Sequence, residues 1–251
     1  MKLDDRVCVI TGGARGIGEA IANRFAAEGG RMAIWDLDGP AAAESAARFG
    51  GSGHACDVMA RSDVDRACSE TLERHGRIDV LVNNAGVALA GPTETFSDAD
   101  WDTSIGVMQT GVFLCSQIVG RHMLERGSGS IVNISSINAW AAFPMRLAYC
   151  AAKAAVVAMT EVLAIEWADR GIRVNAVAPG VTRTALVQKG IDEGVIDVDR
   201  YIARTPLNRF GEPDEIARAV LYLANDEDGA FVTGTTLRID GGWSAQGWII
   251  R

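Results

Sequence analysis

The stretch TGGARGIG, residues 11–18, lies between a short apolar run and a helical pattern. Gly12 allows a tight turn, Gly16 lets backbone approach a pyrophosphate, and Gly18 permits close packing of the following helix. The first turn of that helix offers free N–H groups and a positive dipole end to an anion. Because the glycines separate a predicted strand from a predicted helix, the stretch predicts a dinucleotide-binding turn.

Outward from this turn, short apolar runs alternate with helical patterns along the whole chain. Most of the runs are too apolar for half-exposed strands, so they predict parallel strands covered on both faces. The alternation implies right-handed crossovers and an α/β fold, a doubly wound parallel sheet of Rossmann type with helices on both faces. The predicted strands are residues 6–10, 31–36, 53–57, 78–83, 129–134, 172–178 and 236–240.

Apolar residues recur at helical spacing between these runs. Ile17, Ile21 and Phe25 define one face after the first strand, and longer patterns cover 97–126, 148–170 and 213–225. Residues 184–208 break the rhythm, with weak periodicity, and predict a flap over a substrate. No linker or repeat divides the chain, so residues 1–251 are predicted to form one dinucleotide-binding and catalytic domain.

Composition excludes several classes of protein. The 251 residues are 48% hydrophobic and 22% charged, with a formal net charge of −8, and no basic cluster indicates nucleic-acid binding. The N-terminal segment is neither a signal peptide nor a membrane span, so a cytoplasmic location without membrane contact is expected. Five cysteines without a Cys-x-x-Cys pair predict buried reduced thiols, and the scattered histidines predict no metal site.

Acidic residues end the second and third predicted strands. Asp36 stands where an adenosine ribose would lie, and its carboxylate would bind the ribose hydroxyls and repel a 2′-phosphate. Arg15 could instead neutralise such a phosphate, but a close carboxylate–phosphate pair outweighs a mobile arginine. The sequence therefore predicts NAD as cofactor in preference to NADP. Asp57 is a weaker candidate for binding the adenine amino group.

Further motifs occur in a fixed order: NNAG at 83–86, Ser136, YCAAK at 149–153, PGVTRT at 179–184 and DGG at 240–242. With TGGARGIG, they resemble the short-chain dehydrogenase/reductase family over nearly the whole chain. The resemblance implies a nicotinamide cofactor, hydride transfer between NAD(H) and a secondary alcohol or ketone, and a dimer or tetramer.

The resemblance also implies roles for individual residues. Tyr149 is the expected acid–base group, Lys153 holds the nicotinamide ribose and lowers the tyrosine pKa, and Ser136 holds the substrate oxygen. Ser135 does not have the family's interval to the tyrosine and is expected to be structural. The residues expected to bind the cofactor are Gly12, Arg15, Gly16, Ile17, Gly18, Asp36, Asp57, Val58, Asn84, Gly86, Tyr149, Lys153, Pro179, Gly180, Thr182 and Thr184.

The chemistry of Tyr149 and Lys153 supports those roles. A free tyrosine has a pKa of about 10, so a phenol that accepts a proton near neutral pH needs stabilisation of its phenolate. A decrease of three pKa units corresponds to about 4 kcal/mol. The four-residue spacing places both side chains on one helix face, where the ammonium can supply part of that energy.

One position departs from the family pattern. An asparagine commonly anchors a water next to the lysine, and Met108 stands in its place within VMQTG, residues 107–111. A thioether accepts weakly and donates nothing. Gln109 or Thr110 could take over through a shifted helix turn, backbone carbonyls could hold the water, or proton exchange could follow another route.

The substrate is expected to contact the segment after Ser136, through Asn138, Trp140, Phe143 and Met145. Arg146 could meet an anionic substrate, although a solvated arginine at a helix start is the more ordinary interpretation. Secondary alcohols, cyclic alcohols, polyols and hydroxy acids all fit, and the sequence does not choose among them.

Two alternatives stay open at this stage: an NADPH-dependent 3-oxoacyl-thioester reductase and a non-catalytic protein that senses NAD(H). The apolar content of helices 97–126 and 148–170 predicts that they contact another subunit of a homo-oligomer. The tail WSAQGWII, residues 243–250, carries two tryptophans that could dock on a neighbouring subunit.

Overall fold

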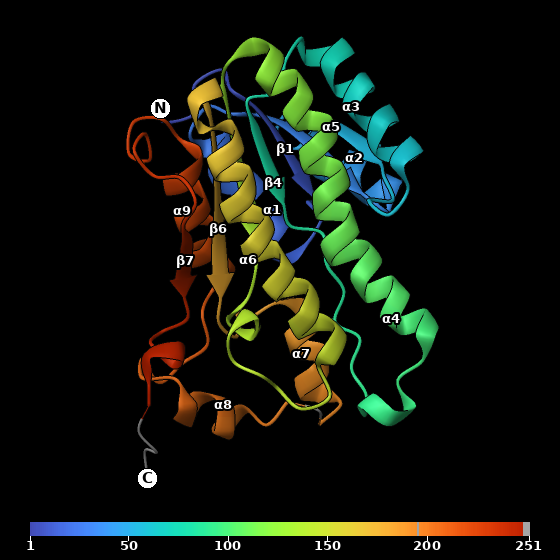
Figure 1. The fold of residues 1–251 in the computed structure, drawn as a ribbon, viewed down its shortest axis with the longest axis vertical. Helices are drawn as coiled ribbons and strands as arrows, with labels where there is room; N and C mark the ends of the chain where they lie inside the picture. The colour runs from blue at the N-terminus through green and yellow to red at the C-terminus, as the bar shows by residue number, and fades with distance from the viewer. Residues whose placement is uncertain (195, 248–251) are drawn as a thin grey trace.

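A computed structural model describes residues 1–194 and 196–247 (Figure 1). Within them, seven parallel strands form one sheet in the order β3-β2-β1-β4-β5-β6-β7. The predicted fold class is confirmed. The strands are β1 (Val7–Thr11), β2 (Arg31–Asp36), β3 (Ser52–Ala55), β4 (Val80–Asn83), β5 (Gly129–Ile134), β6 (Ile172–Pro179) and β7 (Thr236–Ile239).

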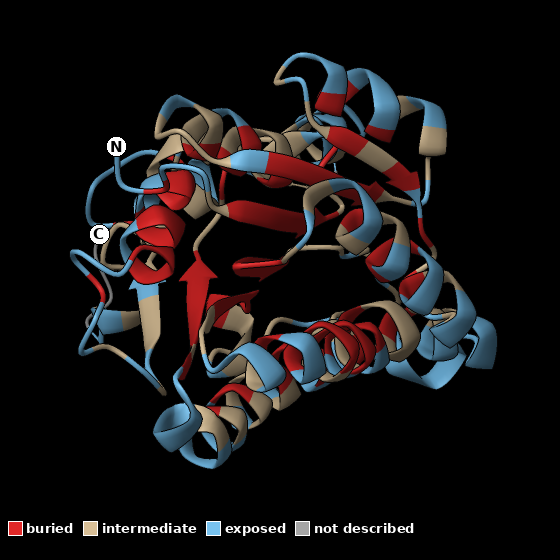
Figure 2. Cartoon of the chain, turned by 90° about the horizontal axis from the view of Figure 1, so that it is seen from above, coloured by how far each residue is buried: buried red, intermediate tan, exposed pale blue. Residues whose placement is uncertain are grey.

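Helices cover both faces of the sheet, and the central strands are buried between them (Figure 2). One core layer joins the sheet to α1, α2 and α9 through side chains such as Ile21, Phe25 and Ile216. The other joins it to α3, α5 and α6 through Val64 and Leu114. The α-helices are α1 (Gly16–Ala27), α2 (Gly39–Ala47), α3 (Arg61–His75), α4 (Asp98–Ile105), α5 (Gly111–Arg126), α6 (Leu147–Trp167), α7 (Ala185–Asp192), α8 (Val198–Arg204) and α9 (Pro213–Ala224).

The predicted helices and strands agree with the structure to within a few residues at their ends. The pattern over 97–126 is α4 and α5 joined by a π-helical turn at Gly106–Thr110. Residues 184–208 differ from the irregular segment that was predicted, because they contain the short helices α7 and α8. None of the residues in these two helices is buried, and with eight and seven residues the helices are too short for a periodicity argument.

The order of strands places the site. The chain runs outward from β1 through β2 to β3, and then returns to place β4 on the other side of β1. Ligands of open α/β sheets bind beyond the carboxyl ends of the strands at such a reversal. Gly12 follows β1, Asn84 follows β4 and Ser136 follows β5, so three predicted site segments lie along this edge.

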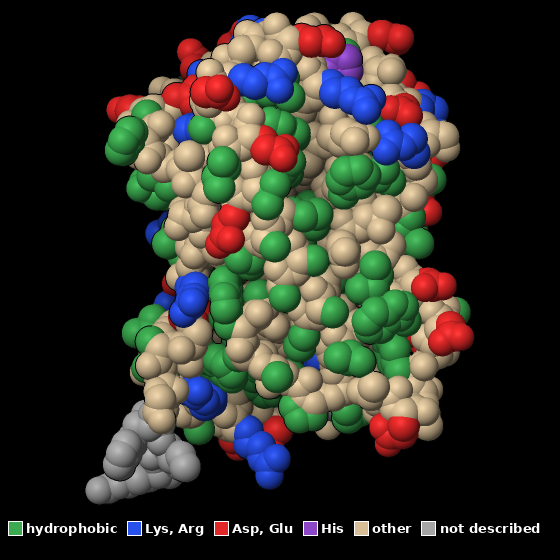
Figure 3. All heavy atoms as spheres, in the orientation of Figure 1, with side chains coloured by type: hydrophobic (Ala, Val, Ile, Leu, Met, Phe, Trp, Pro, Cys, Tyr) green, Lys and Arg blue, Asp and Glu red, His purple; other side chains and the backbone are tan. Residues whose placement is uncertain are grey.

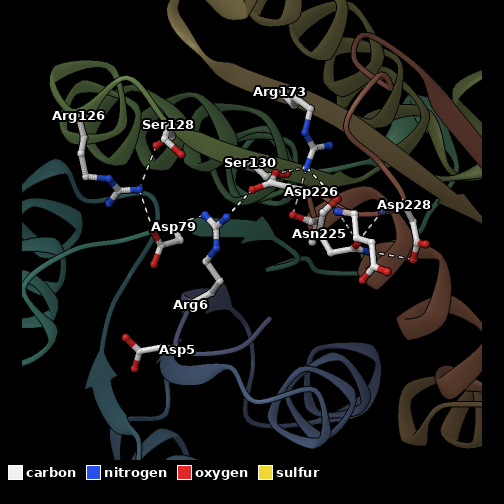
Figure 4. A network of polar contacts seen from close by, with 12 residues as sticks. Asp5, Arg6, Asp79, Arg126, Ser128, Ser130, Arg173, Asn225, Asp226 and Asp228 are labelled. Atoms are coloured by element: carbon white, nitrogen blue, oxygen red, sulfur yellow. Dashed lines mark hydrogen bonds and ion pairs between the residues drawn. The ribbon is translucent and has the colours of Figure 1, made fainter. Parts of the chain in front are cut away.

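A network of charged groups occupies the opposite edge, at the amino ends of the strands (Figure 4). The buried carboxylate of Asp79 accepts hydrogen bonds from the Val7 amide at 2.8 Å, Arg77 Nε at 2.9 Å and Arg126 Nη2 at 2.8 Å. Arg173 donates to the carbonyls of Leu223 and Ala224 at the end of α9. These bonds fasten the starts of the strands to neighbouring helices.

In the described residues, the segment Leu147–Arg170 is long and apolar enough to cross a membrane. It comprises α6 and a short 3₁₀ turn, and it packs on β6. One face of it, which carries the buried Lys153, packs against the fold, and 33% of its most apolar window is buried.

Candidate active site

The glycine turn has the backbone that the sequence predicts. Gly12 and Gly16 have φ angles of +59° and +62°, which favour glycine. A Cβ on Gly18 would lie 2.3 Å from the Gly12 carbonyl oxygen, so only glycine lets α1 start this close to the turn. A Cβ on Gly16 would meet only Thr184 within 4 Å, at 3.9 Å, which is an ordinary van der Waals distance. The turn at residue 16 therefore lies close to residue 184 at this edge of the sheet.

Asp36 connects the end of β2 to the glycine turn. One carboxylate oxygen accepts from the Ala14 amide and the other from the Asp38 amide, both at 3.1 Å. Each oxygen keeps a lone pair for a further donor. Arg15 forms an ion pair with Asp38 at 2.5 Å, so its charge is already partly neutralised.

Asn84 braces the turn from the neighbouring strand. Its side-chain amide donates to the carbonyls of Thr11 and Gly12 at 3.0 and 2.9 Å. The Thr11 hydroxyl accepts from the amides of Asn84 and Ala85, both at 3.0 Å. The structure therefore places Asn84 at the groove but uses its donors to hold the loop, and Thr11 is a participant that sequence reasoning missed.

The other predicted cofactor residues lie at the same edge of the sheet. Ile17 lies in the first turn of α1, Asp57 and Val58 follow β3, and Gly86 follows β4. Residues 180–184 follow β6, where Thr182 is buried and donates to the Gly180 carbonyl, and Thr184 caps α7. Pro179 ends β6, and a Cβ on Gly180 would lie 2.8 Å from Asp240 Cα, which ties this segment to the DGG motif.

The Ser136, Tyr149 and Lys153 side chains come together where β5 ends against α6. Lys153 is buried, donates to the Ile134 carbonyl at 2.7 Å, and lies 5.7 Å from the centre of the Tyr149 ring. Ser136 interacts with the Tyr149 phenol. Ser135 donates instead to the Lys153 carbonyl at 3.0 Å, as expected of a structural serine, and so fixes α6 to the strand.

The electrostatics of this trio differ from the expectation. Burial raises the pKa of Tyr149 above its usual value of about 10, and the opposing effects of Ser136 and Arg146 are smaller. Burial lowers the pKa of Lys153 to about 8. In the protein alone the net shift of the tyrosine pKa is therefore upward, opposite to the lowering expected at the site, because desolvation outweighs the charges around the phenol. Lys153 is not among the groups that shift it, and its effect on the phenol stays a prediction.

Met108 is fully buried within the π-helical turn. A Cβ on Gly86 would lie 3.8 Å from Met108 Cγ, so the thioether packs beside the NNAG segment. Single π-helical turns insert an extra residue and are frequent at functional sites. The helix turn is therefore irregular at this point, with Met108 buried, Gln109 half-buried and Thr110 exposed, and a replacement of the asparagine by Gln109 or Thr110 stays a prediction.

The segment after Ser136 carries the predicted substrate residues. The backbone N–H of Asn138 donates to the Ser136 hydroxyl at 3.1 Å. Trp140 and Met145 are exposed. The Phe143 ring stacks against Tyr201 of α8 at 6.1 Å and against Trp243 at 5.2 Å between ring centroids. Tyr201 and Trp243 were missed because nothing local in the sequence connects them to residue 143. The second tryptophan of the tail, Trp248, lies outside the described residues.

The cysteines agree with the prediction of reduced thiols. All five are free, and all but Cys150 are buried. Burial raises the pKa of Cys56 and of Cys68 to about 12, which suppresses thiolate formation. Within residues 1–194 and 196–247, no group of three His, Cys, Asp or Glu side chains is arranged to hold a metal ion.

The fold, the glycine turn and the Ser–Tyr–Lys trio define a nicotinamide-dependent oxidoreductase. Residues 12–244 match the family described as Enoyl-(Acyl carrier protein) reductase. The chain is 43% identical over 248 residues to a D-threitol dehydrogenase from Mycolicibacterium smegmatis, covering 97% of this chain and 94% of that one. It is 37% identical over 247 residues to an NAD-dependent glycerol dehydrogenase from Listeria innocua, covering 97% and 95%.

Among solved structures, a 3-ketoacyl-(acyl-carrier-protein) reductase from Brucella melitensis complexed with NADH superposes with a TM-score of 0.90. It is 32% identical, and the match covers 96% of this chain and 99% of that one. The chain therefore belongs to the short-chain dehydrogenase/reductase family. It is an oxidoreductase that transfers a hydride between a nicotinamide cofactor and the CH–OH carbon of a secondary alcohol.

Proposed function

We propose that this enzyme uses NAD(H) in preference to NADP(H) and that Ser136, Tyr149 and Lys153 carry the reaction. Two interactions beside the glycine turn support the cofactor choice: the hydrogen bond from the Ala14 amide to Asp36 and the ion pair of Arg15 with Asp38. Asp36 presents a carboxylate beside the glycine turn, and Asp38 holds the one arginine of that turn in an ion pair. A 2′-phosphate would meet a carboxylate there and an arginine that is already paired.

The residues present fit a dinucleotide. The positive φ of Gly16 and its place as the first residue of α1 suit a pyrophosphate against the backbone and the helix N-terminus. Asp36 would bind the adenosine ribose, Asp57 and Val58 the adenine, and Lys153 the nicotinamide ribose. Thr182, Thr184 and the 179–180 backbone would bind the carboxamide end. When bound, NAD⁺ supplies the hydride acceptor and a positive ring.

The chain's own residues would then move the proton. Ser136 holds the substrate oxygen, and Tyr149 takes the hydroxyl proton as the carbinol carbon is oxidised. Because burial raises the tyrosine pKa, the phenolate needs further stabilisation in the complex. A Lys153 ammonium that moves from the Ile134 carbonyl to a ribose hydroxyl would provide part of it while staying within reach of the phenol.

The substrate class that we propose is a secondary alcohol or polyol, or the corresponding ketone. The threitol and glycerol dehydrogenases support a polyol, and the half-buried Asn138 supplies a polar group beside Ser136. The residues of 184–208 would form the covering flap, since Tyr201 already stacks on Phe143 of the substrate segment. A 3-oxoacyl-thioester reductase is the rival, supported by the Brucella melitensis relative.

Exposed apolar side chains support a homo-oligomer. Hydrophobic groups gather over the face that α4, α5 and α6 present (Figure 3). They include Trp101, Phe113, Leu147, Val162 and Ile165, and the last is 82% exposed. Contiguous apolar surface of this kind is usually covered by a partner. We propose that a second copy covers it and that the enzyme acts in the cytoplasm as a dimer or tetramer.

The test measures turnover of a panel of secondary alcohols, polyols and 3-oxoacyl thioesters. NAD(P)H absorbance monitors the reaction with each cofactor in turn. We expect a higher kcat/KM with NAD than with NADP, and oxidation of at least one polyol. Preferred reduction of a 3-oxoacyl thioester would instead establish the rival. Binding of NADH without turnover of any substrate would contradict both.

A further inference from the structure

The segment that leads into α6 holds a residue in an unusual conformation. Met145 has a φ of +64° although it is not glycine, and its carbonyl accepts from the Gly91 amide at 3.0 Å. A left-handed conformation of a bulky residue is strained and persists only where surrounding contacts enforce it. The next residue is Arg146, so the Met145 conformation fixes the direction in which the chain presents the arginine.

Three arginines come from segments around the Phe143 aromatic cluster, and two of them are engaged. Arg204 lies over the Trp243 ring at 4.5 Å and donates to the Trp243 and Gln246 carbonyls. Arg238 lies over the Trp140 ring at 4.5 Å. Arg146 is half-buried and differs from both, because in the described part of the chain its guanidinium has no hydrogen bond, no aromatic ring contact and no carboxylate within ion-pair distance.

Arg146 is close enough to the reaction centre for its charge to act there. It stands three residues before Tyr149 at the start of α6, a spacing that brings two side chains together on a helix. Its charge lowers the pKa of Tyr149, against the larger effect of burial. Arg146 therefore places a positive charge next to the candidate site, in a chain whose formal net charge is −8.

We propose that Arg146 binds an anionic group of the substrate, a carboxylate, phosphate or sulfonate carried on the chain next to the carbinol carbon. This inference rests on the proposed function, since it assigns the substrate class of that same site. A partly desolvated guanidinium without a carboxylate partner is satisfied best by an oxyanion, which can accept two of its N–H donors at once. A neutral polyol would leave that charge uncompensated.

The experiment compares kcat/KM for one neutral and three anionic secondary alcohols with NAD. The neutral probe is 2-pentanol, and the anionic probes are 3-hydroxybutyrate, 2-hydroxypropyl phosphate and 2-hydroxypropanesulfonate. The wild-type enzyme is expected to favour at least one anionic probe by about tenfold or more, the size of a charge-assisted contact. The preferred probe identifies the kind of anion.

The variants isolate the arginine. Arg146→Gln is expected to reduce the ratio of anionic to neutral kcat/KM by about tenfold, whereas Arg146→Lys keeps part of it. Arg170→Gln is the matched control, because Arg170 is an exposed arginine in the short 3₁₀ turn after the other end of α6, about 36 Å away at 1.5 Å per residue. Using the ratio cancels any effect of the substitution on Tyr149 itself.

An unchanged ratio in Arg146→Gln, or a wild-type preference for 2-pentanol, would overturn the inference while leaving the proposed function intact. Absence of turnover with every alcohol would overturn the proposed function. In that event, calorimetric titration of 3-hydroxybutyrate, the phosphate and the sulfonate into NADH-saturated protein decides the inference. Weaker binding to Arg146→Gln than to wild type supports it, and equal or undetectable binding to both contradicts it.

Discussion

The Lys153 ammonium donates to the Ile134 carbonyl at 2.7 Å and lies 5.7 Å from the centre of the Tyr149 ring. The end of β5 thus holds the ammonium of α6 beside the proposed catalytic tyrosine. Because the surrounding protein desolvates both groups, the pKa of the tyrosine is raised and that of the lysine is lowered. Each shift opposes the charged form of its group, and each gives a measurable consequence.

The pH dependence of alcohol oxidation should report Tyr149. Because the phenol must lose its proton before it can accept one, kcat/KM is expected to rise with pH and to level off above the tyrosine pKa of the reacting complex. Tyr149→Phe should lower kcat by about 10²–10⁴-fold, the range for loss of a general base. A variant that kept most of its activity with the same pH profile would rule Tyr149 out as the base.

The pH dependence of the free energy of unfolding should report the protonation of Lys153. Its pKa is about 8 when folded and 10.5 in the unfolded reference, so between these values the unfolded chain binds more protons and stability rises with pH. Lys153→Met should raise the free energy of unfolding by about 2 kcal/mol at pH 7, because 2.5 pKa units correspond to about 3.4 kcal/mol and the lost hydrogen bond offsets about 1 kcal/mol.

Urea unfolding at pH 7 and pH 10.5 measures this effect, and the gain should disappear at the higher pH. Lys189→Met is the control, because Lys189 is an exposed lysine paired with Glu193. A decrease in stability at pH 7 for Lys153→Met would show that the buried ammonium is not destabilising.

Cofactor choice should depend on Asp36. Asp36→Ser removes the carboxylate expected to repel a 2′-phosphate and should raise the NADP to NAD ratio of kcat/KM by about tenfold, or about 1.4 kcal/mol. Asp38→Asn keeps Asp36 and frees Arg15 from its ion pair, so it should have a smaller effect. A larger shift in Asp38→Asn would make the arginine the determinant.

The buried thioether gives a prediction about proton exchange. Met108→Asn introduces an amide that can hold water beside the NNAG segment, where Met108 offers only a weak acceptor. Hydride transfer should persist and proton exchange should become faster, with a changed solvent isotope effect. Identical pH–rate profiles and solvent isotope effects in the wild-type enzyme and Met108→Asn would contradict this prediction.

The network at the amino ends of the strands should govern stability without touching the chemistry. Asp79→Asn removes a buried charge that serves Arg77, Arg126 and the Val7 amide, and should destabilise the fold by about 3 kcal/mol. Asp226→Asn removes an exposed partner of Arg6 and Arg173, and should change stability by less than about 1 kcal/mol. Equal losses would contradict the network. Both variants should keep kcat where they are folded.

Sequence reasoning predicted the parts of the fold that local chemistry determines. The glycines at 12, 16 and 18 adopt the backbone and the close packing that their spacing predicts. The four-residue interval placed Tyr149 and Lys153 on one helix face, and the apolar runs predicted buried parallel strands. Helices α7 and α8 were not predicted, since they are short, with eight and seven residues, and bury no residue.

Long-range contacts could not be predicted from the chain. The Ile134 carbonyl as partner of Lys153, the Thr11 hydroxyl as acceptor for residues 84 and 85, and the stack of Phe143 on Trp243 all join distant segments. The balance between burial and charge at Tyr149 was misjudged for the same reason. Desolvation depends on how much protein surrounds the phenol, which no motif records.

The two edges of the sheet have consequences for how such an enzyme can change over evolutionary time. The ionic network around Asp79, drawn in Figure 4, lies at the amino ends of the strands. Tyr149 follows the carboxyl end of β5, at the opposite edge. Mutations in 184–208 or near Arg146 can therefore change substrate specificity without loss of the interactions around Asp79 that stabilise the fold. That separation makes the scaffold evolvable, because effects at distant sites add independently.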